Sequence, residues 1–211
     1  FEEAWEKAGG AGSGRTVKIQ APGPITLAVQ LERSNGHRAI TDAGALRDLA
    51  ASLAEGVAVH RAEVARRLSV PVVVQFDEPL LPAALAGRIT GVTALSPVHP
   101  VDEVLAIGLY NDCVARLGGD VMLHCCAADL PWTMLQRSAI QAVSIDVAML
   151  GPDGLDGLGS FVDSGRTAVL GLLPGLAPDI RPSAEEVAAA AAAVTDRIGF
   201  PRAVLCERIG I

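Results

Sequence analysis

Six short apolar segments recur along the chain, and segments with helical character separate them. The most regular is Val70–Phe76 (VPVVVQF), which is apolar over most of its length. A continuous apolar run, rather than an alternating one, is typical of a parallel strand that is covered on both faces. The other predicted strands are Val17–Gln20, Val121–Leu123, Ala142–Ile145, Thr167–Leu172 and Arg202–Leu205. Strands that alternate with helices predict an α/β fold with a parallel sheet.

A long helix is expected to begin at a cap formed by Thr41 or Asp42 and to end near Leu68. Apolar residues recur within this segment at spacings of three and four, which is typical of a helix with one buried face. The remaining expectations are helices at Val101–Leu117, Phe161–Ser164 and Ser183–Ile198, and a loop at the glycine-rich segment Gly151–Gly159.

Polar residues follow the predicted strands at the point where each strand ends. They are Asp77, Glu78, His124, Cys126, Asp146 and Cys206. In a (β/α)8 barrel the carboxyl ends of the strands form the active site, and in an open doubly wound sheet they line a crevice. No GxGxxG or GxxxxGK[ST] motif follows a predicted strand, which argues against a nucleotide-binding version of the open sheet.

The segment DVMLHCCAAD (120–129) has the features of a metal site. Residues two apart on a strand point to the same face, so His124 and Cys126 can converge on one ion while Cys125 points the other way. Asp146 and Cys206 follow other predicted strands and extend the set to four. Histidine, cysteine and carboxylate ligands suit zinc. The alternative is that these cysteines and the histidine simply pack in the core.

Asp77 and Glu78 end the most regular strand. Two carboxylates at the end of a buried strand are costly unless they have a partner or a function. We therefore interpret them as ligands or as contacts to a cation on a substrate. The alternative is that Asp77 caps the turn that follows.

The composition limits the class of protein. The length of 211 residues suits one domain, 1–211. The net charge of −7 argues against nucleic acid as a partner, because phosphate binding needs clustered lysine and arginine. No run of about 18 apolar residues is present, so a membrane span is not expected. The charged start is unlike a signal peptide, and the cysteine pattern suggests free or metal-bound thiols in a reducing cytoplasm.

Several stretches resemble the C-terminal catalytic barrel of cobalamin-independent methionine synthases, within the superfamily of uroporphyrinogen decarboxylase-like and methionine synthase-like barrels. They are APGPITLA (Ala21–Ala28), VVVQFDEP (Val72–Pro79), the HxC of His124 and Cys126, and AVSID (Ala142–Asp146). The resemblance implies a TIM-type (β/α)8 barrel with a catalytic zinc. It also implies methyl transfer from 5-methyltetrahydrofolate to homocysteine.

The resemblance also implies roles for single residues. His124 and Cys126 match two zinc ligands, and Asp146 stands where the family usually has a glutamate ligand. Asp77 matches an aspartate that holds the homocysteine ammonium, and Glu78 is its neighbour at the substrate site. Cys206 is the candidate for the last zinc cysteine.

The chain departs from the family pattern in four respects. Asp146 is one methylene shorter than glutamate, and the residues after Cys206 read more like a helix than like the family's loop. The segment Leu173–Pro182 contains no counterpart of the family's general-acid histidine. About six βα units are predicted, so the barrel is expected to be incomplete, with its first strands absent.

Three functions follow from these features. The first is a zinc methyltransferase that forms methionine, with a methylfolate or a methyl-corrinoid protein as donor. The second is a degenerate barrel that binds a thiol or a metal without turnover. The third, which rests on fold analogy alone, is an enzyme like uroporphyrinogen decarboxylase, which needs no metal.

Overall fold

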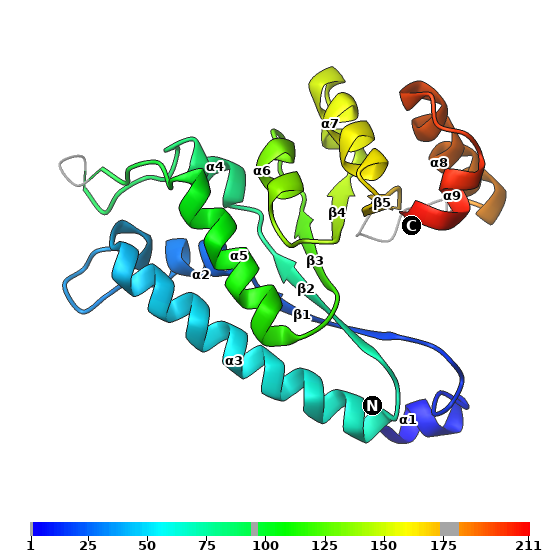
Figure 1. The fold of residues 1–211 in the computed structure, drawn as a ribbon, viewed down its shortest axis with the longest axis horizontal. Helices are drawn as coiled ribbons and strands as arrows, with labels where there is room; N and C mark the ends of the chain where they lie inside the picture. The colour runs from blue at the N-terminus through cyan, green and yellow to red at the C-terminus, as the bar shows by residue number, and fades with distance from the viewer. Residues whose placement is uncertain (1, 94–96, 174–181) are drawn as a thin grey trace.

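A parallel β-sheet organises the part of the chain that the computed structural model describes, residues 2–93, 97–173 and 182–211 (Figure 1). Its strands are β1 (Val17–Pro22), β2 (Val72–Asp77), β3 (Val121–Cys125), β4 (Ala142–Asp146), β5 (Thr167–Gly171) and β6 (Ile209–Gly210). Each strand pairs in parallel with the next one along the chain. This is the strand order of a TIM-type barrel, which eight strands close, so the described sheet corresponds to an incomplete barrel of the expected class.

One helix precedes β1, and the others connect successive strands. They are α1 (Glu2–Lys7), α2 (Pro24–Gln30), α3 (Ala43–Leu68), α4 (Leu81–Leu85), α5 (Glu103–Leu117), α6 (Trp132–Arg137), α7 (Pro152–Asp163), α8 (Ala184–Ile198) and α9 (Ala203–Arg208), with the 3-10 turns η1 (Ala39–Thr41) and η2 (Val147–Met149). The long helix α3 confirms the expected one, and Asp42 caps it by accepting hydrogen bonds from the amides of Gly44 and Ala45. No helix in the described residues is both long and apolar enough to cross a membrane.

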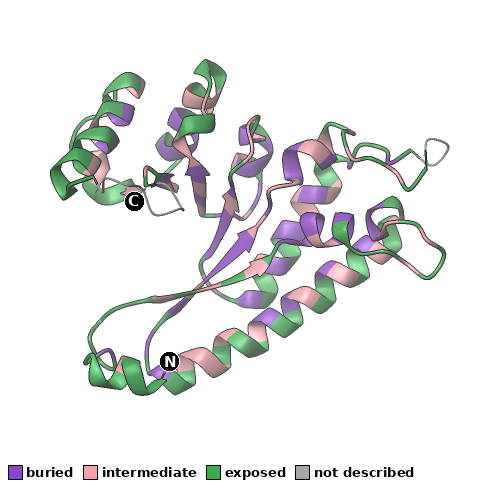
Figure 2. Ribbon diagram, turned by 180° about the vertical axis from the view of Figure 1, so that it is seen from behind, coloured by how far each residue is buried: buried purple, intermediate pink, exposed green. Residues whose placement is uncertain are grey.

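The two faces of the sheet differ in burial. Figure 2 shows strands β1 to β3 in front of α3 and α5, so these helices cover one face of the sheet. The strand residues on the helix-covered face are buried and include Val74, Phe76, Leu123, Val143 and Leu170. The alternating residues form a second face, the open face, which is less buried and more polar.

Two predictions of secondary structure near the C-terminus are wrong. The segment Arg202–Leu205 is not a strand: residues 203–208 form α9, and the last strand is β6. The segment 151–159 is not a loop but most of α7. Pro152 stands at the start of α7, where its fixed backbone angle suits a helix.

The glycines of α7 serve packing rather than flexibility. A Cβ atom on Gly157 would lie 2.1 Å from a ring carbon of Trp132, and one on Gly159 would lie 2.8 Å from Ile198. The two glycines therefore allow α6 and α8 to pack closely against α7. A count of glycines in the sequence cannot distinguish this use from a loop.

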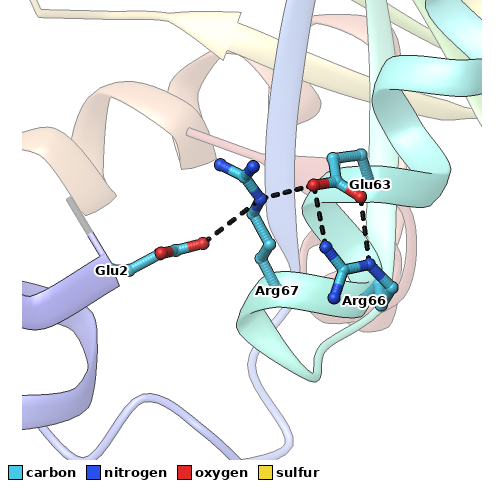
Figure 3. A network of polar contacts seen from close by, with 4 residues as sticks. All are labelled: Glu2, Glu63, Arg66 and Arg67. Atoms are coloured by element: carbon cyan, nitrogen blue, oxygen red, sulfur yellow. Dashed lines mark hydrogen bonds and ion pairs between the residues drawn. The ribbon is translucent and has the colours of Figure 1, made fainter.

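Exposed charges connect α1 to the C-terminal end of α3 (Figure 3). The Nε atom of Arg67 lies 3.5 Å from a carboxylate oxygen of Glu2 and 2.5 Å from one of Glu63. Arg66 also bonds to Glu63, and hydrogen bonds from the two arginines lower the pKa of this carboxyl. All four side chains are at least partly in solvent, where ion pairs contribute little to stability.

The helix-covered face, and not this ion-pair network, is expected to determine stability. Leu123 is fully buried in β3, so Leu123→Ala should lower the free energy of unfolding by about 3 kcal/mol through lost burial and a cavity. Arg67→Ala should leave it unchanged within error. Urea denaturation of both variants tests this, and equal losses would show that α1 docking matters as much as the core.

Candidate functional site

Polar residues meet on the open face near the carboxyl ends of β2, β3 and β4. Asp77 is the register partner of His124, and His124 is the register partner of Ser144. Adjacent strands lie about 4.8 Å apart, so these three residues form a continuous row across the sheet. Asp146 follows two residues after Ser144 on the same face.

Asp77 is held by two glutamine side chains from the open face. The Nε2 group of Gln75 donates to Oδ1 at 2.6 Å, and the Nε2 group of Gln20 donates to Oδ2 at 3.4 Å. Lys18 in turn donates to Oε1 of Gln75 at 2.5 Å. Asp77 is half-buried in the structure, so its carboxylate remains within reach of a bound molecule.

His124 is oriented by its neighbour on β4. Its Nδ1 atom lies 3.2 Å from the hydroxyl oxygen of Ser144. The other ring nitrogen, Nε2, has no hydrogen-bond partner within the described part of the chain. A histidine held through one nitrogen presents the other to a ligand, as metal-binding histidines do. Cys126 lies just beyond β3 and is exposed.

The two buried thiols, Cys113 and Cys125, are shifted toward the neutral form. Burial raises the pKa of Cys125 to about 11, and burial likewise raises the pKa of Cys113 to about 11. Both are therefore neutral thiols near pH 7 and poor nucleophiles. Cys125 lies on the helix-covered face, opposite His124, as the two-residue period predicts.

Asp146 already has a structural partner. Its Oδ1 atom accepts a hydrogen bond of 2.9 Å from the amide of Ala148, and so caps the turn η2. It also borders a cavity of about 190 Å³ whose walls include Trp132, Ile145 and Leu150. Asp146 thus lines a small, partly apolar cavity as well as capping this turn.

The four predicted zinc ligands do not form a ready-made site. Cys206 lies on α9 and is exposed. Among residues 2–93, 97–173 and 182–211, no group of three or more histidine, cysteine, aspartate or glutamate side chains is placed to hold a metal ion. Of the four predicted ligands, His124 and Cys126 lie closest together in the sequence, two residues apart. The segment in which we expect no counterpart of the general-acid histidine is Leu173–Pro182. Most of it, residues 174–181, lies outside the described residues.

Glu78 is a fully buried carboxylate, which the sequence did not predict. One of its oxygens, Oε1, accepts hydrogen bonds from the amide of Ile25 at 2.9 Å and from the hydroxyl of Tyr110 at 2.8 Å. The other, Oε2, accepts from the amide of Thr26 at 2.8 Å and from its hydroxyl at 2.6 Å. Burial raises the pKa of Glu78, and these four hydrogen bonds oppose that effect.

Glu78 joins the ends of the first three strands. The amide of Glu78 donates to the carbonyl of His124, and the amide of Gly23 donates to the carbonyl of Asp77. The carboxylate of Glu78 also accepts hydrogen bonds from the amides of Ile25 and Thr26 in the first turn of α2, and so fixes the start of this helix. Sequence reasoning missed Thr26 and Tyr110 as its partners. Tyr110 is the single tyrosine of the chain and lies within a predicted helix, so nothing nearby in sequence pointed to it.

Comparison with known proteins identifies a family. Residues 2–211 match the family model described as cobalamin-independent synthase, catalytic domain. A search of curated proteins returns no match.

The close approach of the 23–26 turn to Glu78 generates a prediction. A Cβ atom on Gly23 would lie 2.3 Å from the carboxyl carbon of Glu78, which is buried and cannot move aside. Gly23→Ala should therefore lower the free energy of unfolding by about 2 kcal/mol or more. Thermal and urea unfolding measure the loss.

Gly56→Ala is the matched control for this substitution. A Cβ atom there meets open space on α3, so the change should stabilise the protein by about 0.5–1 kcal/mol. Equal effects of the two substitutions would contradict the proposed packing of Gly23 against Glu78.

Proposed function

Because the chain belongs to the family of cobalamin-independent synthase catalytic domains, we propose that it catalyses methionine synthase-type methyl transfer. The methyl group of 5-methyltetrahydrofolate, or of a methyl-corrinoid protein, passes to the sulfur of homocysteine. The carbon–sulfur bond of methionine forms, the bond from carbon to the donor breaks, and the thiol proton is released. The observation that carries this proposal is the family match over residues 2–211, with Asp77 and His124 side by side at the expected strand ends.

Asp77 is the proposed anchor for the ammonium group of homocysteine. It is a half-buried carboxylate at the carboxyl end of β2, where barrel active sites lie. An ammonium donates hydrogen bonds and carries the opposite charge, so the pair is a charge-assisted contact. Binding at Asp77 places the rest of the amino acid near His124, the register partner of Asp77.

Glu78 supports the site from beneath rather than through direct contact. From the sequence, Glu78 is expected to contact the substrate beside Asp77. Since both of its carboxylate oxygens already accept hydrogen bonds from the protein, we propose that it holds the 23–26 turn beside Asp77.

Zinc is the proposed metal, with His124 and Cys126 as its first ligands. Nitrogen and sulfur donors suit zinc, and the ring of His124 is already oriented by Ser144. Asp146 and Cys206 complete the proposed set only if they move, because the described residues do not gather three ligands together. Four free cysteines agree with a reducing cytoplasm as the proposed location.

A degenerate barrel that binds a thiol or metal without turnover is the second candidate. The scattered positions of Asp146 and Cys206 favour it. Turnover distinguishes the two functions.

Methionine formation tests the proposed reaction. The purified chain should methylate homocysteine when supplied with 5-methyltetrahydrofolate carrying one or several glutamates, or with a methylcobalamin protein. Asp77→Asn should lower kcat/KM for homocysteine by about tenfold or more, since a neutral amide replaces the charge that binds the ammonium. The exposed Asp112→Asn on α5 is the matched control and should have no effect. Homocysteine binding without turnover on any donor would instead support the second candidate.

Metal content tests the proposed zinc site. The purified chain should hold about one zinc ion, and Cys126→Ala should remove most of it. Cys125→Ala makes the same change at the neighbouring residue, which lies on the helix-covered face of β3, and should leave the metal in place. Elemental analysis measures the metal in each variant. A metal-free chain, or equal metal content in both variants, would contradict the proposed ligands.

A further inference from the structure

We infer that Gln75 is a positioning residue that fixes Asp77 for the ammonium group of a thiol amino acid. The inference rests on the proposed function, because it assigns Asp77 to the substrate. Gln75 is not part of the predicted site, and it reaches the substrate only through Asp77.

Gln75 is an unexpected residue in the middle of β2. Its neighbours Val74 and Phe76 are completely buried, and Gln75 itself is only 3% exposed. An amide side chain without partners costs free energy when it leaves water, so a buried glutamine needs hydrogen bonds to both ends. It finds them in Lys18 and Asp77.

Lys18 determines which way the amide faces. The ammonium group of a lysine can only donate hydrogen bonds, so the atom 2.5 Å from Lys18 Nζ must be the amide oxygen of Gln75. The amide nitrogen then faces Asp77, where it donates to Oδ1 at 2.6 Å. The orientation thus follows from chemistry as well as from the positions of the atoms.

The bond from Gln75 is the closer of the two that hold Asp77. Gln20 comes from the neighbouring position on β1 and reaches Oδ2 only at 3.4 Å. Gln20 is also exposed, whereas Gln75 is buried. Gln75 therefore limits the rotation of the carboxylate more than Gln20 does. A carboxylate has about four acceptor positions, so two bonds from glutamines leave positions for an ammonium group.

The interposed amide also separates two charges. Among the residues that the structure describes, Lys18 makes no ion pair with Asp77; its ammonium group bonds to Gln75, which in turn bonds to Asp77. An aspartate neutralised by a lysine would bind an ammonium poorly. A glutamate in place of Gln75 could only accept hydrogen bonds, so it could not hold Asp77. Glutamine supplies the donor while the carboxylate keeps its charge for the substrate.

Two ligands that differ only in the amino group test the inference. Homocysteine and 4-mercaptobutanoate share a thiol, a carboxylate and the chain length, but the second lacks the ammonium. Dissociation constants for both are measured by calorimetry on the full chain. The wild-type protein should bind homocysteine more tightly. Gln75→Leu should weaken homocysteine binding by about tenfold and change binding of 4-mercaptobutanoate by less than about twofold.

Two further variants make the result decisive. Lys18→Met changes an exposed residue, so it should fold normally, and it should weaken homocysteine binding by about threefold because the amide is free to turn. Gln141→Leu is the matched control: Gln141 is exposed and its side chain donates only to the nearby carbonyl of Ala139, so both affinities should stay unchanged.

The outcomes separate the inference from the proposed function. A wild-type protein that does not prefer homocysteine over 4-mercaptobutanoate overturns the role of Asp77, and with it this inference. If the wild type shows the preference but Gln75→Leu weakens both ligands equally or neither, only the positioning role is overturned. Should Gln75→Leu fail to fold, Lys18→Met decides, and unchanged homocysteine affinity in that variant overturns the inference.

Discussion

The site depends on the hydrogen bonds that the buried carboxylate of Glu78 accepts. This carboxylate accepts four hydrogen bonds, two of them from main-chain amides of the turn that follows β1. Its own amide donates to the carbonyl of His124, so one residue joins the ends of three strands. A charged group without water is costly, and here fixed donors replace the water. Asp77 directly precedes Glu78 in the chain, so the hydrogen bonds of Glu78 also help to hold Asp77 at the end of β2, on the open face.

The open face carries two polar chains that end at the same edge of the sheet. One runs from Lys18 through Gln75 to Asp77, and the other joins Ser144 to His124. Both lie on the face that a barrel encloses, where polar groups can be held away from bulk water. The first chain is complete in the structure. The second ends at His124, which is proposed as a metal ligand, and the described residues do not gather three ligands around it.

Much of the fold was predictable from local pattern. The buried strand β2 and the long helix α3 carry strong periodic signals, and Asp42 is a typical cap. The ends of β2 and β4 lie within one residue of the predicted ends, at Asp77 and Asp146, whereas β3 runs two residues further than predicted, to Cys125. The errors lie at α7 and α9. Glycines that serve helix packing look like loop residues in a sequence, and a short apolar segment such as residues 202–205 suits a strand or a helix equally well.

The sequence by itself determined the class of fold, the family and the approximate positions of the first five strands, because these depend on patterns within a few residues. Only the tertiary structure decided which of those residues meet. It supplied the buried carboxylate of Glu78 with partners from within the protein, since Thr26 and Tyr110 approach it from positions 52 and 32 residues away. It also placed Cys206 on an exposed helix, apart from His124 and Cys126. Such partnerships depend on packing between distant segments, which no local pattern records.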